Sequence, residues 1–151
     1  MKKFIFALQP VLEHRKRIED EKQLAAAARK RALAQAEAEL ARLNDEFRTY
    51  SMKLRKEHAK LQTGELQSLY AHLQFVDRCT VAQLKIVAER RAAFERARLE
   101  LLAASKEKKV VEKLKERRKD SHDKELARVE QKELDDANAR RHGRTLIGGT
   151  P

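Results

Sequence analysis

Apolar side chains, with Thr80 among them, recur at steps of three, four or seven residues along two long stretches of the chain. The first series is Leu33, Ala36, Leu40, Leu43, Phe47, Tyr50, Leu54 and Leu61. The second series is Leu66, Leu69, Leu73, Val76, Thr80, Val87, Phe94, Ala97, Leu101, Ala104 and Val111. Steps of three and four place side chains on one face of an α-helix, and a narrow apolar stripe of this kind forms the seam of a coiled coil. The pattern therefore predicts two long helices that pack against each other through one seam each.

Glycine and proline mark where these helices begin and end, because Gly64 is the only such residue between Pro10 and Gly143. Proline is favourable in the first turn of a helix, where its missing N–H has no intrahelical partner. We expect Gly64 to adopt the left-handed backbone conformation that often ends a helix. The sequence thus predicts helix one at about 10–61, a turn at about 62–65, a longer helix two at about 66–141 and a flexible tail at 142–151. A turn this short makes the helices antiparallel neighbours, so the expected fold is all-α: one elongated antiparallel two-helix coiled-coil hairpin.

The seam has irregular stretches at both ends. Upstream, the apolar residues meet the later series only through a stutter near 29–36, which should relax the supercoil locally. These upstream residues are Val11, Ile18, Ala25, Ala28 and Ala32. In helix two, Gln83 and Arg90 interrupt the seam, as polar residues do when they specify register. Beyond Lys108 the seam thins, and we expect a partner to face its last members, which are Val111, Leu114, Leu126, Val129 and Leu134.

The composition argues against a compact globular core, since 39% of the residues are charged, 5% are aromatic and none is Trp. The formal net charge of +11 favours contact with nucleic acid, anionic lipid or an acidic protein surface. The densest basic run, 106–119, holds eight basic and three acidic residues. Its charges are distributed around the helix, and no aromatic residue follows Phe94 to stack on bases. We therefore expect no nucleic-acid binding.

The sequence lacks the motifs of common catalytic sites. It has no Gly-rich phosphate loop, HExxH, GxSxG or paired cysteines, and its five histidines are scattered. The single Cys79 excludes an intramolecular disulfide. We therefore expect neither enzymatic activity nor a cofactor or metal. The apolar stretch from Phe4 to Leu8 is too short for a signal peptide or a membrane span, which predicts a cytoplasmic protein without direct membrane insertion.

Both ends of the chain contain distinctive sequence blocks: residues 112–141 include LKERR and EQKELD, and residues 4–28 begin FIFALQPVLEHRKRIEDEK. These blocks resemble the FliJ family of flagellar export proteins, in which the first two recur at the end and a sequence similar to the third forms the start. The middle, about 29–105, agrees only in pattern and turn position. The resemblance implies a non-enzymatic component of the bacterial flagellar type III export apparatus, needed for motility and chemotaxis. It also implies a fold similar to the coiled-coil stalk of the ATP synthase γ subunit.

The resemblance further implies the partners and their contact residues. The free ends of the hairpin would insert into a hexameric export ATPase and promote its assembly. The candidates for this contact are Leu12, Arg15, Ile18, Arg117, Arg118, Gln131, Lys132, Glu133 and Leu134. The turn end would contact the export gate protein FlhA, and its candidates are Leu43, Phe47, Tyr50, Leu69, Leu73 and Val76. Core packing is the alternative role for this second set, because its members are also seam residues.

Export chaperones are a further implied partner, which would give the chain a chaperone-escort role. The implied location is the cytoplasmic face of the inner membrane at the flagellar base, by peripheral association. Two alternatives have the same shape: a generic coiled-coil scaffold, and a stalk protein of a virulence type III secretion system. The intact EQKELD block favours the flagellar assignment.

Overall fold

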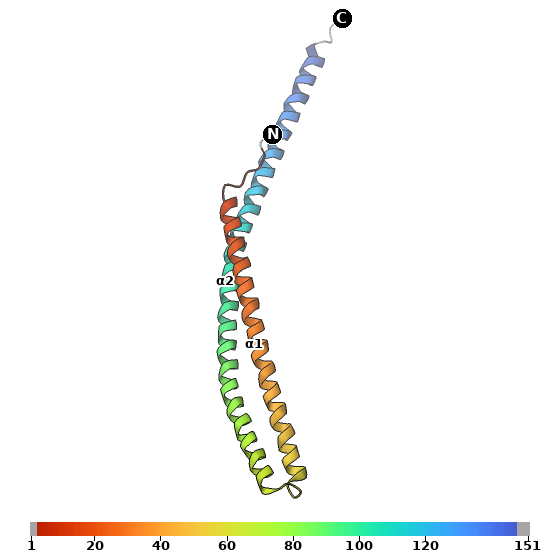
Figure 1. The fold of residues 1–151 in the computed structure, drawn as a ribbon. Helices are drawn as coiled ribbons and strands as arrows, with labels where there is room; N and C mark the ends of the chain where they lie inside the picture. Colours follow the sequence, from red (N-terminus) through yellow and green to blue (C-terminus); the bar gives the residue numbers. More distant parts are fainter. Residues whose placement is uncertain (1–2, 148–151) are drawn as a thin grey trace. The chain divides into compact units, whose positions relative to one another are not determined.

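The computed structural model describes residues 3–147, which form two α-helices joined by a short turn (Figure 1). Helix α1 spans Gln9–Glu57 and α2 spans Thr63–Ile147, with lengths of 49 and 85 residues. The helices pack against each other as a hairpin, so the predicted fold class is confirmed. Pro10 lies in the first turn of α1, where the sequence predicted it.

The helix ends differ from the predicted ones at three places. Helix α1 ends at Glu57 instead of 61, because the N–H groups of Lys60 and Leu61 both donate to the Glu57 carbonyl, at 2.9 and 3.2 Å, and so close its last turn. Helix α2 begins at Thr63 and continues past Gly143 to Ile147. The flexible tail was therefore wrong for 142–147, which are helical. Its remainder, 148–151, lies outside the described residues.

The expected left-handed conformation of Gly64 was also wrong. Gly64 lies in the first turn of α2, and no glycine among the described residues has a positive φ. The start of α2 is capped by Glu65, whose carboxylate accepts a hydrogen bond from the Gln62 N–H at 3.1 Å. The Gln62 carbonyl in turn accepts from the Leu66 N–H at 3.0 Å. This arrangement is half of a capping box, so side-chain capping begins α2.

Contacts divide the chain into two units, each with its own buried side chains. The central unit comprises 17–105, and the terminal unit comprises 1–16 together with 106–151. Phe6 is buried in the terminal unit. The buried residues of the central unit are Ala26, Ala36, Leu43, Leu69, Leu73, Val76, Val87 and Ala104. All of these on α2 belong to the predicted seam, which confirms the helix-two pattern.

Pairs across the central unit establish the antiparallel register. Two ion pairs and one histidine–carboxylate contact join the helices, and residue numbers fall along α2 as they rise along α1 (Figure 1). They are Lys22–Glu100 at 2.7 Å, Glu37–Arg91 at 3.0 Å and Glu46–His72 at 3.0 Å. Gln83 is a polar seam residue as predicted, since its side-chain amide donates to the Ala36 carbonyl at 2.9 Å. Arg90 is exposed, so its predicted place in the seam was wrong.

Burial along the first part of α1 agrees with the predicted upstream seam at only two of its five positions, the half-buried Ile18 and Ala32. The upstream positions predicted for the seam include three exposed ones, Val11, Ala25 and Ala28. The buried residue there is Ala26, and the half-buried Arg15 and Lys22 continue the phase of Leu43 toward the start of the helix. Long basic side chains can occupy a seam because their methylene stems cover apolar surface while the charge stays solvated.

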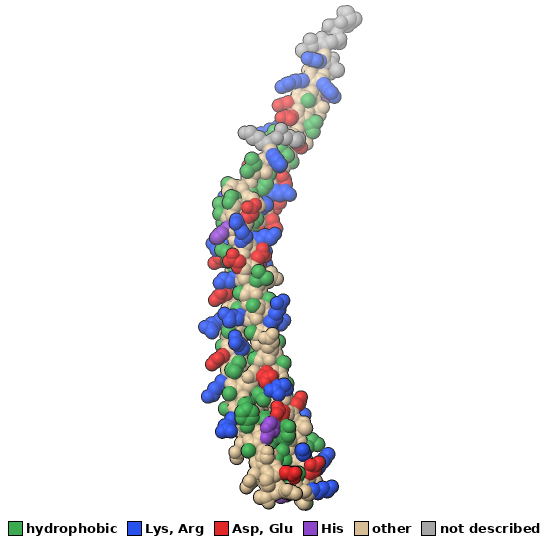
Figure 2. All heavy atoms as spheres, viewed as in Figure 1, with side chains coloured by type: hydrophobic (Ala, Val, Ile, Leu, Met, Phe, Trp, Pro, Cys, Tyr) green, Lys and Arg blue, Asp and Glu red, His purple; other side chains and the backbone are tan. Residues whose placement is uncertain are grey.

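Charged side chains cover the outer faces of both helices. Figure 2 shows Lys and Arg interspersed with Asp and Glu on the visible face, with apolar side chains between them. Across 3–147, neither helix contains a stretch long and apolar enough to span a lipid bilayer.

Candidate functional site

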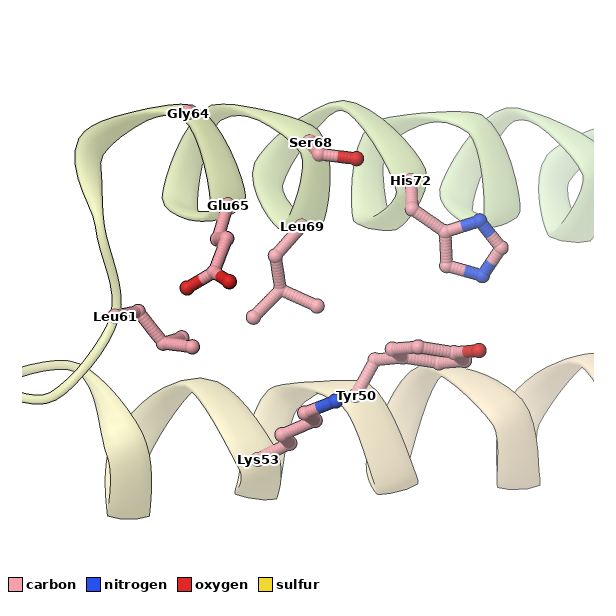
Figure 3. Close-up of a pocket in the computed structure, with 8 residues that line it drawn as sticks. All are labelled: Tyr50, Lys53, Leu61, Gly64, Glu65, Ser68, Leu69 and His72. Carbon is pink, nitrogen blue, oxygen red and sulfur yellow. The ribbon is translucent and has the colours of Figure 1, made fainter.

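Beside the turn, the central unit contains a hollow of about 570 Å³. It is lined by Tyr50, Lys53, Leu61, Gly64, Glu65, Ser68, Leu69 and His72. Figure 3 shows Tyr50 of α1 and His72 of α2 directed toward each other, with Leu61 and Leu69 pointing into the space between the helices. The two ring centroids are 4.4 Å apart, and the planes are tilted by 59°. An aromatic contact and two leucines therefore hold the helices together next to the turn.

A chain of polar contacts leads from His72 along α1. The Nε2 atom of His72 lies 3.0 Å from Glu46, and Arg42 donates to Glu46 at 3.0 Å and to Glu39 at 2.7 Å. The hydrogen bond from Arg42 lowers the pKa of Glu39, and Glu39 raises the pKa of Arg42. The contact between His72 and Glu46 joins α2 to α1, and the bonds of Arg42 lie within α1.

The export-gate candidates divide into buried and accessible side chains. Leu43, Leu69, Leu73 and Val76 are buried, Val76 with 1% of its surface exposed. A partner could reach these four only if the helices separated. The accessible candidates are Phe47 and the half-buried Tyr50.

Next to Phe47, α1 carries exposed residues that the seam analysis did not single out. Phe47 lines a shallow hollow on α1 together with Asn44, Arg48, Ser51, Met52 and Arg55. Met52 is 47% exposed and lies beside two arginines. These residues lie off the seam, so helical periodicity alone could not single them out. Met52, which lies off the seam on the same helix as Phe47, was the sequence signal that could have indicated them.

In the terminal unit, the segment before α1 packs on α2. Phe6 is 7% exposed, and its ring lies 6.0 Å from the Lys115 ammonium and 5.9 Å from the Arg118 guanidinium. Phe4 contacts His122 with ring centroids 5.5 Å apart. Lys115 also donates to the Gln9 side chain at 2.9 Å. Cation–π and aromatic contacts therefore fasten residues 4–9 to one face of α2.

The ATPase-binding candidates occupy several different environments. In the terminal unit, Arg15 forms an ion pair with Glu107, and Arg118 lies against Phe6. Leu12 is half-buried there, and Ile18 is half-buried in the central unit. The exposed candidates are Arg117, Gln131, Lys132, Glu133 and Leu134. Since a helix rises 1.5 Å per residue, the candidates on α2 form two groups roughly 20 Å apart along its axis.

Hydrogen bonds constrain several charged and polar groups along both helices. Gln131 donates to Asp135 at 2.9 Å within α2. Lys22 donates to Glu100 at 2.7 Å and thereby lowers the pKa of that carboxyl group. Among residues 3–147, no three His, Cys, Asp or Glu side chains gather in a way that could hold a metal ion.

Two antiparallel helices with a thin seam, charged outer faces and exposed apolar side chains define a coiled-coil hairpin. The sequence profile of the family described as flagellar FliJ protein matches residues 3–146. The chain therefore belongs to the FliJ family, a non-catalytic component of the type III export apparatus.

Other comparisons bear on the fold alone. The structure of CT670 from Chlamydia trachomatis, a YscO homologue, is similar with a TM-score of 0.51 and 22% sequence identity. The likeness covers 97% of this chain and 100% of that one. The comparison with curated proteins gives no match.

Proposed function

We propose that this chain binds the hexameric flagellar export ATPase through its terminal unit and promotes assembly of the ring. The family match carries this proposal, because it extends from 3 to 146 and so includes both segments of the terminal unit. The exposed Arg117 and Leu134 offer charged and apolar contacts on α2.

The chain acts on the ATPase by binding. A ligand shifts an assembly equilibrium only through its higher affinity for the assembled state. Stimulation of ATP hydrolysis should therefore be greatest at ATPase concentrations where hexamers are scarce, and it should fade where the ring is already assembled. The excess of basic residues favours an acidic ATPase surface, and salt should weaken that long-range attraction.

The turn end of the central unit contacts the export gate protein FlhA in this proposal. Phe47 and Tyr50 are the candidates that reach the surface, and Met52 and Arg55 extend the accessible face. Export chaperones are further partners. These contacts would locate the chain on the cytoplasmic side of the inner membrane at the flagellar base.

The test is to measure ATP hydrolysis by the cognate ATPase over a range of its concentrations, with and without this chain. We expect Arg117→Glu combined with Leu134→Ala to abolish the stimulation while far-ultraviolet helicity stays unchanged. Arg29→Glu, an exposed reversal on α1 of the central unit, is the control and should stimulate like the wild type. Unchanged hydrolysis with the wild-type chain at every concentration would refute the proposal and favour a generic coiled-coil scaffold.

A further inference from the structure

The N-terminal segment directs alternate side chains to opposite sides. Residues 3–6 precede α1 and have no helical structure. Phe4 packs on His122 and Phe6 is buried against Lys115, whereas Ile5 between them is 84% exposed. Successive side chains of a non-helical, extended segment point to opposite faces, so burying the two aromatic rings leaves Ile5 outward.

Ile5 lies at the edge of a groove that the two parts of the terminal unit form together. The groove has a volume of about 660 Å³. It is lined by Lys3, Ile5, His122, Glu125, Leu126, Val129, Glu130 and Glu133. Its residues on α2 recur at steps of three and one, so they form one face of the helix. Neither the N-terminal segment nor α2 provides this groove alone.

The groove combines apolar walls with negative charge. Ile5, Leu126 and Val129 supply apolar surface, and Val129 is 52% exposed. Three carboxylates line the groove against a single lysine, in a chain whose formal net charge is +11. An apolar surface bordered by carboxylates favours an occupant with apolar side chains flanked by Lys or Arg.

We propose that this composite groove binds a basic, apolar segment of the export ATPase. The inference rests on the proposed function for the identity of the partner. It adds that the partner segment is positively charged, and it names the groove residues that bind this segment. The terminal unit then offers the exposed Arg117 and, separately, the acidic groove, which shares Glu133 with the candidates from the sequence.

A pair of charge-matched variants tests the electrostatic half of the proposal. In the full chain, the groove variant Glu125→Lys, Glu130→Lys is compared with the control variant Glu116→Lys, Asp120→Lys. Both pairs lie on α2 in the terminal unit and change the net charge equally, but the control residues do not line the groove. We expect the groove variant to weaken ATPase binding at least about tenfold at low salt, and the control to remain within about twofold.

Each outcome of this comparison decides between the two proposals. If the wild type binds the ATPase and the two variants behave alike, the groove inference fails and the proposed function stands. Tighter binding by the groove variant than by the control would mean that the partner surface is acidic, which also overturns the inference. If the wild type does not bind the ATPase at all, both proposals fail.

A second pair tests the apolar half. Val129→Ser changes the groove, and Val110→Ser changes another exposed valine of the terminal unit that does not line it. We expect Val129→Ser to weaken ATPase binding several-fold and Val110→Ser to leave it unchanged. Equal affinities for the two variants, with helicity intact in both, would exclude apolar docking in the groove.

Discussion

Leu43 and Leu24 are both leucines of α1, but one is buried and the other is exposed. Leu43 is 6% exposed in the seam of the central unit, and Leu24 is 74% exposed. Leu43→Ala should lower the free energy of unfolding by about 2–5 kcal/mol, because it removes buried methyl groups and leaves a cavity. Leu24→Ala should change it by less than about 0.5 kcal/mol. Urea unfolding followed by circular dichroism measures both, and similar losses would contradict the assigned seam.

The pair formed by Lys22 and Glu100 gives a prediction about pH. The hydrogen bond from Lys22 is the main cause of the lowered pKa of Glu100, whose usual value is 4.5. A carboxyl group with a lowered folded pKa contributes stability that is complete above pH 4.5 and is lost as the pH falls through the folded pKa. Lys22→Gln should therefore raise the pKa of Glu100 in a carboxyl NMR titration.

The same variant should also alter the dependence of stability on pH. Wild type and Lys22→Gln should differ in stability at neutral pH and converge below the folded pKa of Glu100. The difference should be small, because the pair is solvent-exposed and screened. A stability difference that grows on acidification would show that Lys22 contributes through packing instead.

At the scale of the elements, Gly64 gives the clearest prediction. It lies in the first turn of α2 without a positive φ, and a Cβ atom added there would meet nothing within 4 Å. Gly64→Ala should therefore stabilise the chain by about 0.4–1 kcal/mol, mainly by reducing the entropy of the unfolded state. Glu65→Ala, which removes the partner of the Gln62 N–H, should lower stability. If Gly64→Ala destabilised the chain, this result would support the left-handed conformation that the sequence predicted for Gly64.

The seams illustrate what apolar periodicity can and cannot predict. On α2 the seam followed directly from Leu, Val and Phe residues at helical steps, and the structure buries or half-buries each predicted apolar position from Leu66 to Val111. On the first part of α1, Arg15 and Lys22 occupy seam positions. Ala25 and Ala28 were predicted to lie in the seam there, but they are exposed. Whether a lysine stem packs in the seam also depends on what the other helix places opposite it, and Glu100 faces Lys22 only in this register.

The candidate sites were less predictable than the fold. The resemblance at the ends of the chain indicated Glu133 and Leu134, but nothing in the helical pattern indicated that Ile5 would lie in a groove with Val129. Residues 3–6 have no helical period, so their position depends on where Phe6 is buried on α2. The start of α2 also depended on the side-chain cap from Glu65. The sequence alone did not distinguish this cap from a turn formed by Gly64.

For the whole molecule, burial predicts a gradient of local stability along α2. Between Leu69 and Val87 the helix contains four buried side chains, whereas none is buried at 123–144. Local opening is easiest where a helix buries little apolar surface. Hydrogen exchange by mass spectrometry should therefore show slow exchange at 69–87 and much faster exchange at 123–144. Equal protection of both stretches would mean that the later one packs on something else, such as a second copy of the chain.

The positions of the tyrosines give the turn end of the central unit its own absorbance and fluorescence. The chain has two tyrosines and no tryptophan, and Tyr70 lies on α2 near the same turn. Absorbance near 280 nm, and the fluorescence excited at that wavelength, therefore come from this part of the chain. The terminal unit contains no tyrosine or tryptophan and contributes to neither. The unmodified protein thus contains its own fluorophore for events beside the turn, where the imidazole of His72 lies against Tyr50. A change in tyrosine emission would report on the surroundings of the turn without any label.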